Sequence, residues 1–392
     1  MAEPQGTPGG GATLAACVDF GSTFTKAALV DVRTGELLAS ASHRTTIDTD
    51  VLDGWDACLA EMLAVDPRAA RAEVLACSSA GGGLRIAVVG NEALVTAEAG
   101  RRVALSSGGR VVHVASGGLT RVGLRELRAT RPDVVLLVGG TDGGNAEVLL
   151  ACASTLARAR WRGPVVVAGN VEAQPAVAAL LAAAGTPHVL ADNVVPQIGV
   201  LAPDPARSAI REMFLRHVIG GKHLSQRADF TAMVRGATPD VVLTAVELLA
   251  TGLDERPGAG DVVVVDVGGA TTDVHSVVEL DPEDAGLGRE VVATVPVSRT
   301  VEGDLGMRWS AVPTVEEGLA AGLLDDAEHP GAGDVVVVDV GGATTDVHSV
   351  VEPDASDSHG DHGLSRQVVA TVAVSRTVEG DLGMRWSAVP AV

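Results

Sequence analysis

The chain has 392 residues, and its 29 Lys and Arg against 50 Asp and Glu give a net charge of −21. At about 150 residues per domain, this length indicates two or three domains. A hydrophobic fraction of 46% and a charged fraction of 20% exclude a mainly disordered or fibrous chain. The acidic balance argues against a nucleic-acid partner, because neutralising phosphates requires clustered Lys and Arg.

The N-terminal sequence, the lengths of the apolar runs and the cysteines together favour a cytoplasmic protein. The first twelve residues lack the basic region and apolar stretch of a secretory signal, and we expect a flexible tail there. No apolar run approaches the roughly 18 residues of a membrane span. The four cysteines form no C-x-x-C pair and lie in apolar segments, which favours reduced thiols: Cys17, Cys58, Cys77 and Cys152.

Apolar strand-like segments alternate with helix-like segments, which predicts an α/β fold with a parallel sheet buried on both faces. The expected strands, in chain order, are 14–19, 24–32, 74–77, 84–89, 133–138, 165–168 and 188–190. The expected helices are 53–63, 92–102, 146–160 and 173–184, followed by a mostly helical stretch over 207–252. The densest basic group is interpreted as a solvated helix face, with a docking patch as the alternative: Arg121, Arg125, Arg128 and Arg131.

The first candidate site is the turn in the sequence DFGSTFTK, between two apolar strands. Gly21 lets the backbone approach an anion closely. Backbone N–H groups and the Ser22 and Thr23 hydroxyls can bind phosphate oxygens. Asp19 can hold a hydrated magnesium ion, and Lys26 can neutralise phosphate charge. The alternative is an ordinary β-hairpin with a Gly-Ser turn.

A second segment has the same plan. An apolar strand at 262–265 leads to Asp266, then to a glycine turn with two hydroxyls, Thr271 and Thr272, and to another strand. Facing each other, the two hairpins would clamp the phosphates of a nucleotide from both sides. Asp19 and Asp266 would then flank the metal ion and the attacking water.

A tandem repeat occupies the last third of the chain. Residues 258–279 and 331–352 are identical over 22 residues, and 291–313 match 368–390 at 22 of 23 positions. Two near-identical copies indicate a recent duplication or an error in the gene model. The expected organisation is a tail, a first lobe, the start of a second lobe and the repeat of 256–313, at residues 1–12, 13–255, 256–328 and 329–392.

The paired hairpins resemble the phosphate-one and phosphate-two motifs of the actin, sugar-kinase and heat-shock ATPase superfamily. Six segments, in order over about residues 13 to 325, resemble more closely the MutL/GlmL family, the accessory protein encoded beside adenosylcobalamin-dependent glutamate mutase. These segments are VDFGSTFTKAALVD, LACSSAGGGLR, LLVGGTDGGN, VVVAGN, DVGGATTDVHSV and RTVEGDLGMR. The resemblance implies an actin-like (ribonuclease H-like) ATPase fold, with two lobes of mixed sheets flanked by helices.

The resemblance further implies ATP and Mg²⁺ as cofactors and a chaperone or reactivase role toward the subunits of a cobalamin-dependent mutase. It makes Asp19 and Asp266 the catalytic and metal-binding residues. The implied cofactor-binding residues are Gly21, Ser22, Thr23, Thr25, Lys26, Gly268, Gly269, Ala270, Thr271, Thr272 and Asp273. The second copy is identical here and could substitute through Asp339, Gly341, Gly342, Thr344 and Thr345. We favour the first copy, because 315–324 continues from it as an expected helix.

The superfamily also has a third, glycine-rich segment that holds the adenosine. Here the repeat occupies that region, and we expect no such segment to follow. Two alternatives therefore stay open: a small-molecule kinase of the same fold, and a non-catalytic mutase-binding module.

Four further features have both a binding and a structural interpretation. The segment 139–145 joins a strand to a helix and could bind an anion, or it could be a structural turn in which Asp142 caps the helix. The glycine-rich loop at 78–83 is a weaker ligand candidate. Arg299, Glu302 and Asp304 could line the cleft, with helix capping as the alternative for Asp304. His275 and His348 are expected to be core or surface histidines. His359 and His362 could bind a metal adventitiously, but their acidic loop at 354–362 is better interpreted as solvated and flexible.

Overall fold

The computed structural model describes residues 13–253, 256–278 and 296–302, and the backbone of three later strands at 337–340, 345–350 and 374–379. The chain forms two compact units, and neither is continuous in sequence. Unit 1 comprises Met1–Gly81 and Ile219–Thr238, and unit 2 comprises Gly82–Val218 and Pro239–Val392. The expected first lobe, 13–255, therefore contains parts of both units, because residues 82–218 are inserted between two strands of the unit 1 sheet.

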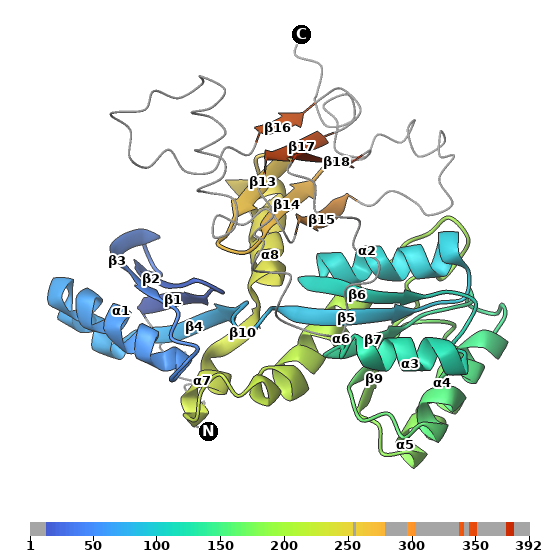
Figure 1. The fold of residues 1–392 in the computed structure, drawn as a ribbon. Helices are drawn as coiled ribbons and strands as arrows, with labels where there is room; N and C mark the ends of the chain where they lie inside the picture. The colour runs from blue at the N-terminus through green and yellow to red at the C-terminus, as the bar shows by residue number, and fades with distance from the viewer. Residues whose placement is uncertain are drawn as a thin grey trace, which may run out of the picture. The chain divides into compact units, whose positions relative to one another are not determined.

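Unit 1 is built on a five-stranded sheet in the order β10-β4-β1-β2-β3 (Figure 1). Strands β1, β2 and β3 form an antiparallel meander, whereas β4 runs parallel to β1 and β10 runs parallel to β4. The strands are β1 Leu14–Phe20, β2 Phe24–Asp31, β3 Glu36–Arg44, β4 Glu73–Ser78 and β10 Val234–Ala237. The helices are α1 Val51–Val65 and α7 Ala228–Met233, with short 3₁₀ turns η1 Pro67–Arg71 and η4 Gly220–Lys222.

The returning segment 219–238 is fastened to unit 1 by packing and by hydrogen bonds. The rings of Phe20 in β1 and Phe230 in α7 meet edge to face, with centroids 5.2 Å apart, and both side chains are buried. Asp50 caps α1 by accepting a 2.9 Å hydrogen bond from Leu52 N. Its other carboxylate oxygen accepts from Ser225 Oγ at 2.9 Å, so the cap also holds this segment.

The inserted part of unit 2 contains a five-stranded sheet in the order β6-β5-β7-β8-β9, and every pair in it is parallel. The strands are β5 Leu84–Val89, β6 Gly109–Ala115, β7 Val134–Leu137, β8 Val165–Val167 and β9 His188–Leu190. The helices are α2 Glu98–Ser106, α3 Arg121–Ala129, α4 Glu147–Arg158, α5 Gln174–Ala183 and α6 Asp204–Met213, with π-helical turns η2 Ala93–Ala97 and η3 Phe214–Val218.

This sheet is buried on both faces, as predicted. Ala87 and Val135 belong to one core cluster with Leu149 of α4 and side chains of α3 and α5. The alternating residues, such as Val88, are also fully buried and lie toward the other face, where α2 approaches closely enough that a Cβ at Gly100 would meet Val88. The mixed α/β fold with sheets flanked by helices is thus confirmed.

Beyond the insertion, helix α8 Thr238–Thr251 leads through the small pair β11 Gly252–Leu253 and β12 Arg256–Pro257 to two three-stranded antiparallel sheets. The first meander consists of β13 Val262–Val267, β14 Thr272–Val277 and β15 Val297–Glu302. The second meander consists of β16 Val337–Val340, β17 Thr345–Val350 and β18 Val374–Glu379. No helix in the described part of the chain combines the length and apolar character needed to cross a bilayer.

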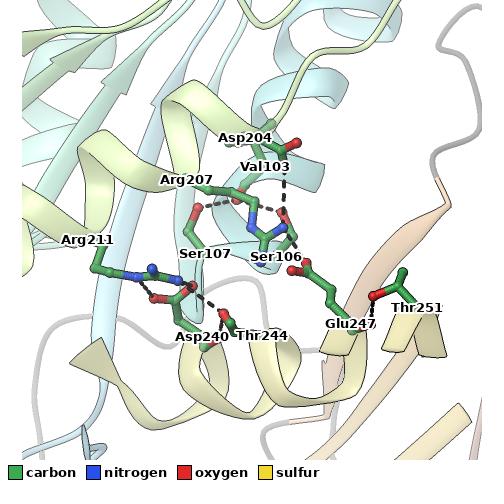
Figure 2. Close-up of polar contacts among 10 residues, drawn as sticks. All are labelled: Val103, Ser106, Ser107, Asp204, Arg207, Arg211, Asp240, Thr244, Glu247 and Thr251. Atoms are coloured by element: carbon green, nitrogen blue, oxygen red, sulfur yellow. Dashed lines mark hydrogen bonds and ion pairs between the residues drawn. The ribbon is translucent and has the colours of Figure 1, made fainter. Parts of the chain in front are cut away.

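Helices α6 and α8 are joined by two ion pairs, which Figure 2 shows. Arg211 donates from Nε and Nη2 to the two carboxylate oxygens of Asp240, at 2.5 and 2.9 Å. One turn earlier in α6, Arg207 donates from Nη1 to Glu247 Oε1 at 2.5 Å. Asp240 and Arg207 are both buried, and each is paired with a partly exposed partner, so the two pairs fix the helices against each other.

Candidate functional site

The predicted turn after β1 is closed by two hydrogen bonds. Gly21 N donates to Phe24 O at 3.1 Å, and Thr45 Oγ1 donates to Gly21 O at 2.8 Å from the other side. A Cβ at position 21 would lie 2.6 Å from Phe24 O, so only glycine fits there without a shift of the backbone. Ser22 and Thr23 occupy the two central positions of this turn.

Asp19 lies where the carboxyl ends of three strands meet. Thr238, which directly follows β10, donates from Oγ1 to Asp19 Oδ1 at 2.7 Å. Cys77 of β4 contacts the same oxygen from its Sγ atom at 3.6 Å. In an open α/β sheet, the region outside the carboxyl ends of the strands is where ligands bind. The structure therefore places Asp19 at the carboxyl ends of β1, β4 and β10, which is the region where a ligand of this sheet would be expected.

Burial and three neighbours have opposite effects on the pKa of Asp19. Burial raises the pKa of Asp19, whereas the Thr238 hydrogen bond and the Lys26 charge act in the opposite direction. Lys26 is exposed and stands opposite Asp19 in the β1–β2 register. Burial and the neighbouring carboxylate raise the pKa of the Cys77 thiol to about 12, so Cys77 stays a neutral donor to Asp19.

Thr238 and Cys77 were not identified from the sequence, because they lie 219 and 58 positions from Asp19 and are brought to it by parallel strand pairing. Thr25, by contrast, was predicted to bind the cofactor, and the structure does not bring it to the Asp19 carboxylate. Its side chain is fully buried, and its hydroxyl lies 3.4 Å from Thr45 Oγ1. Thr25 thus packs inside the unit.

The second predicted turn repeats the first in its local geometry. Gly268 N donates to Thr271 O at 2.8 Å, the same closing bond that joins Gly21 and Phe24. An aspartate stands two residues before the glycine in each hairpin, at Asp19 and Asp266. Asp266 pairs in register with Asp273, and Gly269 and Ala270 lie in the turn. The two hairpins belong to different units, and each has the plan expected from the sequence.

Asp273 and Arg299 form a buried ion pair beneath the second hairpin. Arg299 Nε donates to Asp273 Oδ1 at 2.8 Å, and Nη2 contacts the same oxygen. Arg299 Nη1 also donates to Leu105 O at 2.8 Å and to Gly109 O at 3.1 Å. Arg299 was expected to line a cleft, and it is instead a buried anchor that ties β15 to the end of α2. The nucleotide contact of Asp273 stays a prediction, while its ion pair gives it a structural role.

His275 lies beside this ion pair in the centre of β14. It is completely buried, and neither ring nitrogen has a hydrogen-bond partner in the described part of the chain. Burial and the charge of Arg299 lower the pKa of His275 to about 4, so the ring is neutral at physiological pH. This agrees with the expected core histidine. Asp304, His359, His362 and the expected helix at 315–324 lie outside the described residues.

The loop at 139–145 uses its polar groups within the protein. Asp142 Oδ1 accepts hydrogen bonds from Asn193 Nδ2 at 2.8 Å and from Val171 N at 3.2 Å. The expected capping role of Asp142 is wrong, because Asn145 Oδ1 accepts from Glu147 N at the start of α4. The structural alternative is therefore favoured for this loop.

The carboxylates and hydroxyls at the two hairpins are the kinds of groups that bind Mg²⁺ and phosphate. Among the described residues, no three His, Cys, Asp or Glu side chains gather as a metal site. Mg²⁺ in nucleotide sites needs no such cage, since it is held by one or two carboxylates, substrate phosphates and waters. A single carboxylate beside a glycine turn with hydroxyls, as at Asp19 and at Asp266, fits that requirement.

Two comparisons with known proteins agree on one family. The family model described as MutL protein matches residues 15–329 and matches again over 318–392. Protein MutL of Clostridium tetanomorphum is 40% identical over 298 residues, which is 75% of this chain and 64% of that protein. The chain thus spans less than two thirds of the length of this relative. A xylulose kinase from Bifidobacterium adolescentis aligns over 80% of this chain and 68% of its own, at 14% identity and a TM-score of 0.26.

Proposed function

This chain belongs to the MutL family, and we propose that it is an ATP-binding and ATP-hydrolysing accessory protein of an adenosylcobalamin-dependent glutamate mutase. The proposal combines the family membership with the two hairpins, each of which offers an aspartate, a glycine turn and hydroxyls. In such a system the accessory protein would act on the mutase subunits and promote release of a damaged cobalamin.

The observation that carries the ATP part of the proposal is the setting of Asp19. Its carboxylate stands at the carboxyl end of β1 and is held by Thr238, directly after β10, and by Cys77 from β4. Phosphoryl transfer to water depends on positioning and on charge stabilisation more than on covalent chemistry. A carboxylate whose direction is fixed by its neighbours can orient a water molecule or a hydrated magnesium ion.

The other hairpin residues have complementary roles in this proposal. The backbone N–H groups of both turns and the hydroxyls of Ser22, Thr23 and Thr271 would hold phosphate oxygens. Lys26 would offset part of the phosphate charge. ATP supplies the phosphoanhydride bond and most of the negative charge, and the chain supplies fixed donors and the two aspartates.

The first test is calorimetry of ATP binding in the presence of Mg²⁺. We expect micromolar binding, about −8 kcal/mol, to be weakened by Asp19→Ala. The matched control is Asp31→Ala, which changes an aspartate at the opposite end of β2 from the hairpin turn. Unchanged affinity in Asp19→Ala would contradict the assignment of the site.

The second test addresses the partner. Purified protein with ATP and Mg²⁺ is added to a glutamate mutase that has been inactivated by turnover, and recovery of mutase activity is followed. We expect recovery with the unmodified chain and none with Asp19→Ala. If the chain binds the mutase but neither binds ATP nor restores activity, the non-catalytic binding module is the correct function.

A further inference from the structure

The first meander is held on a defined docking surface of unit 2. Arg299 reaches from β15 to the backbone oxygens of Leu105 and Gly109, at the end of α2 and the start of β6. On the other side, Val277 of β14 is buried against Val246 and Ala250 of α8. We refer to these surfaces of α2, β6 and α8 as the docking surface.

The second meander has the same residues in the same strand pairing. His275 pairs with Arg299 in the first meander, and His348 pairs with Arg376 in the second. Arg299 and Val277 make the docking contacts, and Asp273 pairs with Arg299. They correspond to Arg376, Val350 and Asp346 in the repeat. The family model likewise matches the chain a second time over 318–392. Thus the chain carries two copies of one structural element and, among the described residues, one docking surface built for it.

We propose that the docking surface accepts either meander, so that the two copies exchange on it within one chain. The contacts that hold the first meander are made by residues that the repeat preserves, so the second can make them with the same geometry. The two docked states then differ mainly in the length of chain that joins the docked meander to the rest of unit 2. This inference does not depend on nucleotide binding.

Exchange within one chain is favoured over exchange between two molecules. The described part of each chain brings two meanders and one docking surface, so swapping between chains fills no additional surface and adds the cost of association. A tethered copy also competes at a high effective concentration. The 34 residues from 303 to 336 could span up to about 110 Å when extended, which is ample for either copy to reach.

Thiol labelling of matched positions in the full chain tests the proposal. Ser276 is 1% exposed in the docked meander, and its hydroxyl lies 2.8 Å from Ser298 Oγ. Ser276→Cys and Ser349→Cys are made in separate chains, each alone and combined with Arg299→Ala. Labelling at the introduced thiol is followed by mass spectrometry. The buried native Cys152 of unit 2 serves as the internal control for folding.

Reciprocal changes are the expected result. Arg299→Ala removes charged hydrogen bonds from the first meander only, and we expect the docked ratio to shift at least about tenfold toward the second. The labelling rate of the Ser276→Cys chain should then rise, and that of the Ser349→Cys chain should fall. Arg376→Ala should reverse both changes.

Two results would overturn the proposal. One is that Arg299→Ala speeds labelling of the Ser276→Cys chain while the Ser349→Cys chain keeps its rate, which would mean that the second meander does not take the vacated surface. The other is that neither rate changes, which would mean that Arg299 does not anchor the element. If Arg299→Ala also exposes Cys152, the same comparison is made with Arg299→Lys, which keeps the charge, and its outcomes are judged by the same two criteria.

Discussion

The hydroxyl of Thr238 donates a 2.7 Å hydrogen bond to a carboxylate oxygen of Asp19, although the two residues are 219 positions apart. They meet because β10 returns to the sheet beside β4, in parallel with it, and ends next to the carboxyl end of β1. The relationship links the returning segment of the chain to the residue proposed to act in ATP hydrolysis.

The first prediction concerns this hydrogen bond. Thr238→Ala should weaken Mg²⁺-dependent ATP binding by about tenfold, because one hydrogen bond to a charged group is lost and Asp19 is no longer held in one direction. Thr238→Ser keeps the hydroxyl and should retain most of the affinity. Calorimetry on both variants gives the comparison. Equal affinities for the alanine and serine variants would mean that Thr238 does not position Asp19.

The second prediction concerns the turn that follows Asp19. Gly21→Ala should lower the stability of unit 1 by about 1–3 kcal/mol, because the added Cβ would lie 2.6 Å from Phe24 O. Gly221→Ala in the same unit is the matched control, since a Cβ there has no neighbour within 4 Å. Thermal unfolding of both variants measures the difference. Equal melting temperatures would show that the turn can relax.

Structure formed by neighbouring residues could be predicted from the sequence, whereas structure that depends on pairing between distant strands could not. The hairpin of β1 and β2 follows from alternating apolar residues around a Gly-Ser-Thr turn, which are contiguous in the chain. Strand β10 is only four residues long and lies between helices, so its sequence was expected to be helical. Only pairing with β4, contributed by residues more than 150 positions earlier, makes it a strand. Strand β3 was also missed, because its exposed half is polar and no apolar run marks it.

The residues of the candidate site divide in the same way. Asp19 and Asp266 precede glycine turns, and this local pattern was enough to find them. Thr238 and Cys77 carry no local signal, since each becomes part of the site only through the order of strands in the sheet. Thr25 was assigned to the cofactor because of its position in the motif, whereas its side chain packs inside unit 1.

The third prediction follows from the buried His275. Its pKa is lowered from 6.5 to about 4, so the unfolded chain binds a proton more readily than the folded chain. Stability from this group is therefore complete above about pH 6.5 and is lost as the pH falls toward 4, by no more than about 3 kcal/mol. The Arg299 charge strengthens this effect and the Asp273 charge opposes it.

Denaturant unfolding between pH 4 and pH 7 measures this dependence. Burial also lowers the pKa of His113, so the informative quantity is the difference between the unmodified chain and His275→Leu. We expect the leucine variant to lose less stability than the unmodified chain as the pH falls through this window. Parallel curves would contradict the depressed pKa.

The fourth prediction concerns the joint between α6 and α8. Asp240 is almost completely buried and accepts two hydrogen bonds from Arg211, whose side chain is partly exposed, so Asp240→Ala should destabilise the chain by about 1.5–3 kcal/mol. The exposed pair of Arg216 and Glu212 is the control, and Glu212→Ala should cost less than about 1 kcal/mol. Denaturant unfolding of the two variants tests the contrast. Similar losses would mean that burial does not strengthen the Asp240 pair.

The last prediction joins ATP hydrolysis to exchange of the meanders. If either copy can occupy the docking surface, the second aspartate of the proposed ATP site is Asp266 in one state and Asp339 in the other. With two docked states of similar population, each single alanine substitution should leave about half of the ATP hydrolysis rate, and the double substitution should abolish hydrolysis. Steady-state phosphate release measures all three variants. Complete loss in Asp266→Ala with no effect of Asp339→Ala would contradict exchange and retain the ATP site. A full rate in the double variant would contradict the role of these aspartates in hydrolysis, whichever meander is docked.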